Sequence, residues 1–335
     1  MLRISSGKGL PSLLRYIVAL WEGHALVWIF ALGGWSTCAH AAESITYGGP
    51  RGGTDIGGAY LPATSGFYGF VLGYAANADS YYGSNAHSSN TLKLSGSPVL
   101  GGAGLLYVYP FQLAGGILAS SALESYVALA HLCVNNVCRN STGFSDLYSD
   151  ILMWSRHVGS SGPSEQSLPY GLTVKAALSM NFPTGKYSSS SPVPTPGFNL
   201  YRIIPNFAFT YLAQPNVLGD GIEVSAQFFY GITPVNGTTK YKSGDTVDID
   251  FAVSERFDRW QAGLAGNYAV QLSDDKVNGV SVPGGNRLYV VTLGPVASYA
   301  IPSWKSTFKV KIQLPVYTRN TAHLAAVVTT LVKAF

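Results

Sequence analysis

The chain has 335 residues, of which 11% are charged and 47% are hydrophobic, with 38 glycines and 21 tyrosines. So few charges argue against an ordinary soluble surface, and an only slightly positive mean hydropathy argues against a protein built of many apolar membrane helices. Without the three basic residues and the one acidic residue of the first 41, the formal net charge falls from +4 to +2, which excludes a strongly charged partner such as nucleic acid.

Residues 1–41 have the pattern of a secretory signal peptide. Arg3, Lys8 and Arg15 give a basic start, apolar residues follow, and Ala39-His40-Ala41 offers small residues for cleavage. Because Glu22 and His24 interrupt the apolar stretch, an uncleaved N-terminal anchor is the alternative.

Residues 42–65 show no periodicity and are rich in glycine. One interpretation is a flexible periplasmic arm. The other is a plug folded into a lumen, since glycine lets backbone pack closely in a confined space.

From residue 66 onward the dominant signal is an alternation of polar and apolar residues. In 304–314, Lys305, Lys309 and Lys311 fall on one face of an extended strand, and Phe308, Ile312 and Leu314 fall on the other. This period of two predicts β-structure. It recurs in 172–182, 222–230, 247–254 and 260–272. Twelve strands are predicted at 66–76, 98–109, 113–132, 144–157, 170–182, 202–213, 221–231, 245–257, 260–272, 287–301, 303–317 and 323–335.

One uncharged segment, Leu94 to Leu123, is long enough to be read as a helical span. It contains Gly101-Gly102, Pro110 and Gly115-Gly116, which break helices. We therefore predict two strands with a corner at Pro110.

The predicted connections alternate between tight turns, such as Asp258-Arg259 and Pro302-Ser303, and long loops rich in Ser, Gly, Asn and Pro. This habit, with strands of about 9–11 residues and a C-terminal Phe335, is typical of outer-membrane barrels. The fold class is therefore all-β: a transmembrane antiparallel β-barrel of about 12 strands over 66–335, in the bacterial outer membrane. Its partners would be outer-membrane lipid and, through Phe335, the barrel-insertion machinery. Both termini would lie in the periplasm.

Cysteines give one more local prediction. Cys38 would leave with the signal, whereas Cys133 and Cys138 lie five apart in an exported chain and are predicted to form a disulfide. A metal site is the alternative, but only His131 is near.

Charged residues on the polar strand faces are candidates for lining a lumen. They are Asp146, Lys175, Glu223, Asp248, Asp250, Lys305, Lys309 and Lys311. They either control what passes or form an internal network that leaves no pore, since buried charges must be paired or solvated. Twelve strands lie between a filled barrel and an open one.

Aromatic residues near the predicted strand ends are expected to form girdles at the two membrane interfaces. They include Tyr107, Tyr109, Phe111, Trp154, Tyr201, Phe229, Tyr230, Trp260, Tyr289, Trp304 and Tyr317.

The sequence offers no catalytic or metal-binding residues and no cofactor motif. Beyond the signal it has four histidines, His87, His131, His157 and His323, and none stands in a serine-rich motif with a carboxylate partner.

Several motifs resemble an outer-membrane family named for the meta-pathway of phenol degradation. They are Gly57–Pro62, Leu106–Phe111, Ser145–Tyr148, Asn181–Tyr187, Tyr241–Asp245, Trp260–Leu264 and Gln271–Asp275. Ser145 replaces a family glycine, and Lys333 stands where an apolar residue is usual. The resemblance implies passage of small aromatic or hydrophobic molecules and brings no catalytic residues.

The predicted function is therefore passive uptake of small hydrophobic or aromatic compounds through an outer-membrane channel. A structural or adhesive surface barrel with a blocked lumen is the main alternative, and an outer-membrane hydrolase is a third.

Overall fold

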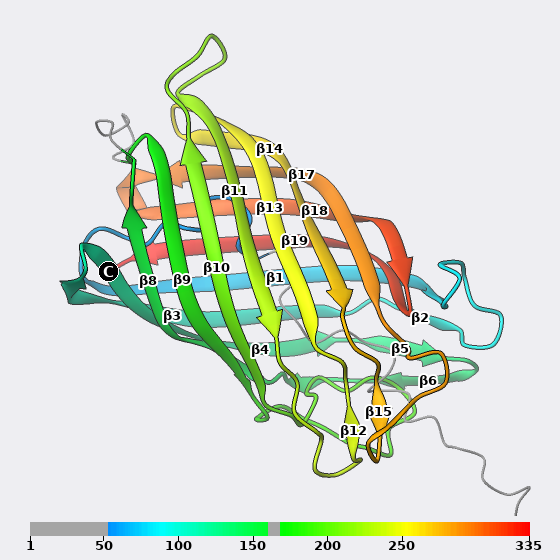
Figure 1. Cartoon of the computed structure of the whole chain (residues 1–335). Helices are drawn as coiled ribbons and strands as arrows, with labels where there is room; N and C mark the ends of the chain where they lie inside the picture. The colour runs from blue at the N-terminus through cyan, green and yellow to red at the C-terminus, as the bar shows by residue number, and fades with distance from the viewer. Residues whose placement is uncertain (1–52, 160–167) are drawn as a thin grey trace, which may run out of the picture. The chain divides into compact units, whose positions relative to one another are not determined.

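The computed structural model of the chain describes residues 53–159 and 168–335. The predicted signal peptide, 1–41, and the first part of the predicted arm lie outside these ranges. Within them, twelve long antiparallel strands form a closed barrel, because the last strand pairs with the first (Figure 1). The barrel strands are β1 (Gly66–Tyr82), β3 (Val99–Leu113), β4 (Gly116–Leu129), β8 (Leu147–His157), β9 (Gly171–Phe182), β10 (Arg202–Leu212), β11 (Gly221–Gly231), β13 (Thr246–Phe257), β14 (Trp260–Gln271), β17 (Tyr289–Ile301), β18 (Ser306–Arg319) and β19 (Thr321–Ala334).

The two ends of the barrel differ. The C-terminus lies at one end, which we call the terminal end, together with the tight turns at 114–115, 258–259 and 302–305. The other end, the loop end, carries the long connections that contain the short strands (Figure 1). These are β2 (Leu94–Gly96), β5 (His131–Val134), β6 (Val137–Asn140), β7 (Gly143–Phe144), β12 (Tyr241–Lys242), β15 (Lys276–Val277) and β16 (Val280–Ser281).

Helices are almost absent from the described ranges, where the one helical element is a single 3₁₀ turn, η1 (Pro302–Trp304). No helix in 53–159 or 168–335 has the length and apolar character needed to span a membrane.

All twelve predicted strands are confirmed, and the uncharged segment 94–123 forms strands, so the helical alternative for it is wrong. The corner predicted at Pro110 is also wrong. Pro110 lies inside β3, where the ladder with β4 is interrupted between Val108 and Gln112. An interruption suits a residue that has no N–H to donate. The turn comes instead at Ala114 and Gly115, with φ of 49° and 72°, as a two-residue hairpin of type I′ requires.

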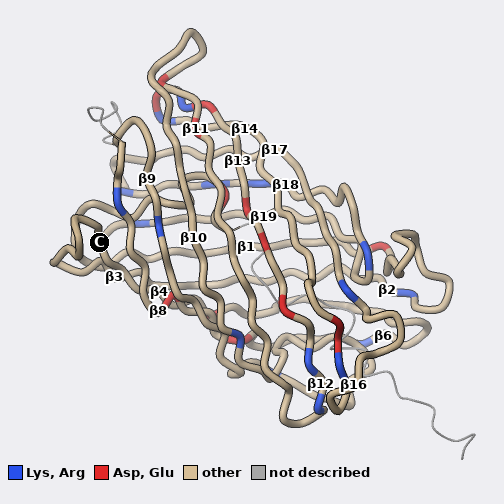
Figure 2. Tube along the Cα trace, in the orientation of Figure 1, with Lys and Arg blue, Asp and Glu red and all other residues tan. Residues whose placement is uncertain are grey.

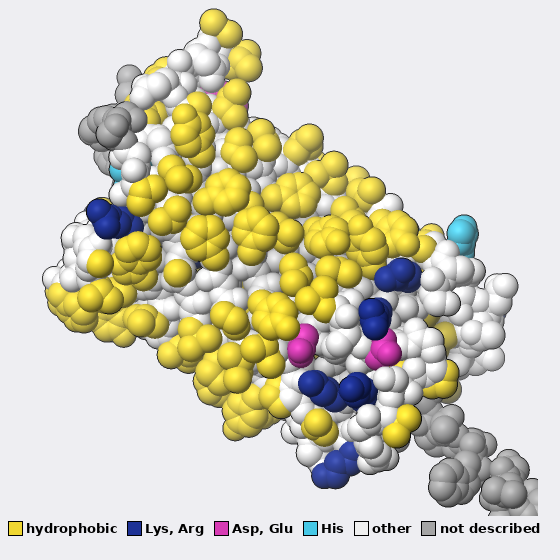
Figure 3. Space-filling model, in the orientation of Figure 1, with side chains coloured by type: hydrophobic (Ala, Val, Ile, Leu, Met, Phe, Trp, Pro, Cys, Tyr) yellow, Lys and Arg dark blue, Asp and Glu magenta, His cyan; other side chains and the backbone are white. Residues whose placement is uncertain are grey.

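The strands have one face toward the barrel exterior and one buried face. In β11, Ile222, Val224 and Phe228 are exposed, whereas the intervening Glu223 and Gln227 are each 1% exposed. The same alternation in β13 buries Asp248 and Asp250. The visible outer surface is consequently a broad hydrophobic band, with charged side chains gathered toward the loop end (Figure 3). Such a band is what a lipid-facing wall needs.

The ladder between β18 and β19 is incomplete. It runs from Ser306 opposite Lys333 to Gln313 opposite Ala326 and stops there, although both strands continue to the turn at Asn320. Beyond that point β19 pairs with β1 alone, and β18 bulges against β17 next to Pro315. These two strands are therefore not hydrogen-bonded to each other near the loop end.

Candidate functional site in the barrel interior

Most of the predicted charged residues lie on the buried strand faces. Glu223, Asp248, Asp250 and Lys311 are at most 1% exposed, and Lys175 is 6% exposed. Lys309 is slightly more open, with 15% of its side chain exposed. The positions of acidic and basic residues along the trace are marked in Figure 2. That these residues line a passage stays a prediction.

Two of the predicted residues lie elsewhere. Lys305 is in the turn before β18, in the left-handed conformation that ends η1, with an exposed side chain. The predicted strand 303–317 begins three residues later than expected, because Pro302 starts a helical turn. Asp146 precedes β8 at the loop end and accepts hydrogen bonds from the backbone N–H groups of Gly185 (3.0 Å) and Phe198 (2.8 Å).

Asp146 thus holds the loop 183–201 against the barrel mouth. Burial raises the pKa of Asp146, and the two backbone N–H donors only partly oppose this shift. Ser141 adds a second tie to the same loop, since its hydroxyl donates to the carbonyl of Pro194 at 2.7 Å.

The segment 53–62 is tied to the buried faces of strands far away in the sequence. Thr54 donates to the Asp250 carboxylate, the N–H of Gly57 donates to Glu223 (2.8 Å), and the N–H of Ala59 donates to Thr210 (3.1 Å). The carbonyl of Ala59 accepts from Ser155 at 2.6 Å. Polar side chains on four strands, β8, β10, β11 and β13, therefore hydrogen-bond to this segment.

Asp55 makes the strongest of the contacts between this segment and the strands. It is fully buried, and its two carboxylate oxygens lie 2.7 Å from Lys309 Nζ and 2.6 Å from Lys311 Nζ. Burial alone would raise the pKa of Asp55, but the two ammonium groups outweigh burial and hold the pKa far below its usual value. Asp55 is therefore ionised, and its single negative charge is shared by two lysines that would otherwise be difficult to bury.

Tyr60 lies beside a second ion pair, that of Arg256 with Glu223. Burial, with a smaller contribution from Glu223, raises the pKa of Tyr60, so the phenol is neutral. Its hydroxyl is buried and has no hydrogen-bond partner in the described structure. A buried polar group without a partner is costly and calls for an explanation.

Sequence reasoning missed that one part of the inner wall is apolar. In β1, the residues alternating with exposed Phe67 and Val71 are Tyr68, Phe70, Leu72 and Tyr74. Their neighbours on β3, β4 and β19 are also mostly apolar, among them Leu100, Leu106, Val127, Leu324 and Val328. We call this strip of β19, β1, β3 and β4 the apolar wall. The available signal was the uncharged segment 94–123, in which both strand faces lack charge.

Glycine makes room for an aromatic ring at one place in the apolar wall. A Cβ atom at Gly104 would lie 2.2 Å from the ring of Phe70, so a side chain at this position would displace the ring.

A cavity of about 400 Å³ lies at the loop end of the apolar wall. It is bounded by residues of β1, β3, β4 and β19 and is roofed by Pro194, Pro196 and Phe198 of the loop that Asp146 holds. Leu72, Tyr74, Leu100 and Leu324 are part of its lining. Its size and apolar lining suit a small hydrophobic molecule.

A second cavity of about 400 Å³ lies toward the terminal end. Its lining includes Gly57 and Tyr60 of the segment 53–62, together with Lys175, Arg256, Arg259 and Lys309. In contrast to the loop-end cavity, it is strongly polar and basic.

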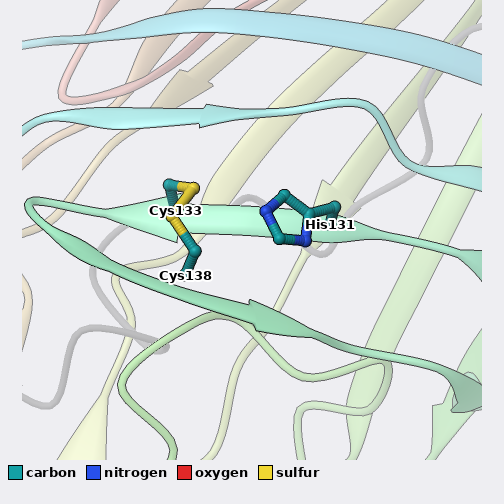
Figure 4. Close-up of side chains that lie close together, drawn as sticks. All are labelled: His131, Cys133 and Cys138. Atoms are coloured by element: carbon teal, nitrogen blue, oxygen red, sulfur yellow. A yellow bond between two sulfur atoms is a disulfide. The ribbon is translucent and has the colours of Figure 1, made fainter.

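The predicted disulfide is confirmed. Cys133 and Cys138 face each other across the hairpin of β5 and β6 at the loop end, with an S–S bond (Figure 4). His131 lies on the same face, and its Nδ1 is 3.0 Å from Asn140 Oδ1. Because the sulfurs are bonded to each other, they are not available as thiolate ligands for a metal.

Each of the four histidines lies within hydrogen-bond distance of a neighbouring group. His323 Nδ1 lies 3.0 Å from Asp79 Oδ1, a carboxylate partner that sequence reasoning did not foresee. However, in the described ranges none of the four imidazole rings hydrogen-bonds to a serine hydroxyl. The hydroxyl that does lie beside an imidazole in these ranges is that of Thr173, 3.2 Å from His157 Nδ1, and no carboxylate hydrogen-bonds to the His157 ring.

Aromatic residues cluster on the outer wall close to the strand ends. The rings of Phe67, Tyr107, Tyr109 and Phe111 form a chain of contacts with centroids 4.7–5.5 Å apart, as do Tyr268, Tyr289 and Tyr317. Phe229 is an exception to the predicted girdles. It is 2% exposed because the period of two puts it on the same buried face as Glu223 and Gln227.

Comparison with known proteins agrees with this geometry. The COG4313 outer membrane channel from Pseudomonas putida F1 superposes with a TM-score of 0.68 at 13% identity, covering 84% of this chain and 99% of that one. The KdgM porin (TM-score 0.38, 10% identity, covering 79% and 99%) and the β domain of the Bordetella autotransporter BrkA (0.44, 10%, 81% and 99%) are more distant.

No curated protein matches the chain. A family model described as "Putative MetA-pathway of phenol degradation" matches residues 58–331, which is most of the sequence and agrees with the resemblance noted from its motifs. With its closed barrel and hydrophobic belt, this outer-membrane protein belongs to that family.

Proposed function

We propose that the barrel is a passive channel for small apolar or aromatic solutes. The observation that carries the proposal is the apolar cavity of about 400 Å³ at the loop end, which continues into the apolar wall. A barrel that served only as a scaffold would have no need of an apolar inner surface, because filling its interior with paired polar side chains would suffice. The family description and the channel with the same fold support the same class of function.

We also propose that the segment 53–62 is a plug in the lumen, as one of the two sequence interpretations holds. Its hydrogen bonds to β8, β10, β11 and β13, and the ion pairs of Asp55 with β18, support this role. In this arrangement the charged strand residues hold the plug, and Leu61 packs with Val108 and Ala119 of β3 and β4. The part of the apolar wall nearer the loop end is left for the solute.

The route would begin in the loop-end cavity and follow the apolar wall. Ala322, Leu324 and Tyr74 line both that cavity and a much smaller one of about 20 Å³, which also touches Pro315 of β18. The smaller cavity lies where the β18–β19 ladder is incomplete. Widening at this place would connect the apolar wall with the lipid.

The test is uptake of a radiolabelled neutral aromatic by Gram-negative cells that produce the protein, compared with cells that lack it. Ala322→Trp should fill the shared part of the two cavities and abolish the added uptake. Val327→Trp, on the lipid side of the same strand and within the paired part of the β18–β19 ladder, is the matched control and should leave uptake unchanged. Uptake equal to that of cells without the protein would reject the channel and favour the blocked surface barrel.

A further inference from the structure

The terminal-end cavity has a composition that the proposed function does not explain. Lys175, Arg256, Arg259 and Lys309 line it, and no aspartate or glutamate is among its lining residues. An uncharged solute would gain nothing from four cations. A cavity with cations on its surface and carboxylates only behind them attracts an anion.

Two of the four cations already have a carboxylate partner. Lys309 pairs with Asp55, and Arg256 pairs with Glu223. Lys175 and Arg259 form no salt bridge within the described ranges. These two side chains are therefore cations of the cavity without a carboxylate in salt-bridge contact, and the sharing of Asp55 by Lys309 and Lys311 leaves one further positive charge.

Of these two side chains, Lys175 gives the stronger evidence for an anion in the cavity, because it is buried. Its ammonium group has three donors, and the hydrogen bond found for it goes to the neutral amide oxygen of Gln227, at 3.1 Å. The nearby carboxylate of Asp150 already accepts from Tyr148, Ser121 and Ser179. A buried ammonium next to a cavity and without a carboxylate partner is favourable only when water or an anion completes its shell.

The Tyr60 hydroxyl is an independent second observation. It is buried and lacks a partner, and Tyr60 is one of the residues that line the same cavity. A neutral phenol is a hydrogen-bond donor, and an anionic oxygen in the cavity would satisfy it. Ile56, Ala300 and Val332 add apolar surface to the same lining, which suits a ligand with a small hydrophobic body.

We propose that this cavity binds the carboxylate group of a small aromatic acid, with Lys175 and Tyr60 as its principal donors and Arg259 at the entrance. The proposal rests on the proposed function, which it deepens by naming a class of solute. The apolar part of this cavity's lining would hold the ring while its cations recognise the charge. The loop-end cavity would hold the same solute at an earlier stage of passage.

The experiment is calorimetric titration of the full-length protein in detergent micelles at low salt, with benzoate and with its neutral counterpart benzamide. We expect benzoate to bind about tenfold more tightly or better, as a charge-assisted hydrogen bond allows. Lys175→Gln should remove this preference, and Tyr60→Phe, which deletes only one oxygen, should weaken benzoate binding several-fold and leave benzamide unchanged. Lys276→Gln is the matched control, because Lys276 is an exposed lysine of β15 at the loop end.

Equal binding of benzoate and benzamide by the unaltered protein would overturn the proposal. So would a loss of preference in Lys276→Gln as large as in Lys175→Gln, or inorganic phosphate displacing benzoate at equal concentration, since both indicate unspecific attraction of anions. If Lys175→Gln fails to fold, the affinities of Tyr60→Phe for benzoate and benzamide decide whether the proposal holds. These outcomes are separate from the channel itself, because uptake of a neutral aromatic by cells tests the proposed function without this cavity's charge.

Discussion

Lys311 and Asp55 are 256 residues apart in the sequence, and the Lys311 ammonium lies 2.6 Å from the Asp55 carboxylate with both side chains at most 1% exposed. The ion pair joins the segment before the first strand to the last but one strand of the barrel. Lys309 shares the same carboxylate from a more open position.

Removing the Asp55 carboxylate should lower the free energy of unfolding much more than removing the Lys309 ammonium group. Asp55→Asn leaves the buried Lys311 without its anionic partner and should cost about 3–5 kcal/mol. Lys309→Gln keeps the Asp55–Lys311 pair and should fold normally, at a cost below about 1.5 kcal/mol. Urea unfolding in lipid vesicles measures both, and equal stability of the two variants would contradict the burial found for Lys311.

The pH dependence of this tie follows from the lowered pKa of Asp55. A carboxyl group whose pKa is depressed in the folded state stabilises that state fully above its unfolded pKa, roughly 3.9, and loses this contribution only as the pH falls further. A spin label at Gly53→Cys, where the structure leaves open space around the added Cβ, should therefore keep the same mobility from pH 8 to about pH 4.5. Introducing Asp55→Asn into the Gly53→Cys protein should make the label mobile at every pH. A change in label mobility near neutral pH in the protein with Gly53→Cys alone would contradict the ion pairs.

The two faces of β18 can be tested with neighbouring residues. Phe308 is 42% exposed on the outer wall, so Phe308→Lys places a charge in lipid and should destabilise the barrel by about 2–4 kcal/mol if it lies near the bilayer midplane. Thermal unfolding in bilayers is the measurement. Lys309→Gln on the other face is the control, and similar losses for both would refute the assigned faces.

Cross-linking tests whether the solute leaves through the incomplete ladder. Leu314→Cys with Ala325→Cys, in a Cys133→Ser and Cys138→Ser background, joins β18 to β19 just beyond the last paired residues, Gln313 and Ala326. Oxidation of this pair should stop uptake of a neutral aromatic, and reduction should restore it, because a closed disulfide prevents widening of the gap.

Val310→Cys with Thr329→Cys is the matched control, since these residues are already paired within the ladder. Uptake that persists in the oxidised 314–325 variant would place the exit elsewhere, without affecting the channel proposal.

Loss of the native disulfide should act locally. The double variant Cys133→Ser, Cys138→Ser should destabilise the β5–β6 hairpin by about 2 kcal/mol, because the disulfide no longer restricts the unfolded loop. This hairpin lies at the loop end, outside the barrel wall. Protease should then cleave the Asn135-Asn136 tip faster, while the thermal midpoint of the barrel stays the same. A large fall in that midpoint would indicate that the hairpin supports the wall.

Much of the fold could be predicted because lipid and a buried interior impose opposite requirements on successive residues. Ile222, Glu223 and Val224 show the rule in three residues, and a strand that repeats it five times has few other ways to fold. The disulfide was predictable for a related reason, since two cysteines five residues apart need only a local hairpin to meet.

The exceptions came from features whose effect is local and specific. Pro110 looked like a corner but interrupts one ladder, and Lys305 looked like a strand residue but ends a helical turn. Phe229 was grouped with interface aromatics, although its place in the alternation buries it.

The sequence by itself determined which strand faces meet lipid, how many long strands there are, and most of the turns, because these depend on near neighbours and on a period of two. Only the tertiary structure decided which inward residues meet. The partners Asp55 and Lys311, Gly57 and Glu223, and the cations around Tyr60 come from distant strands. Barrel closure and strand stagger bring them together, and a periodic pattern carries no record of either.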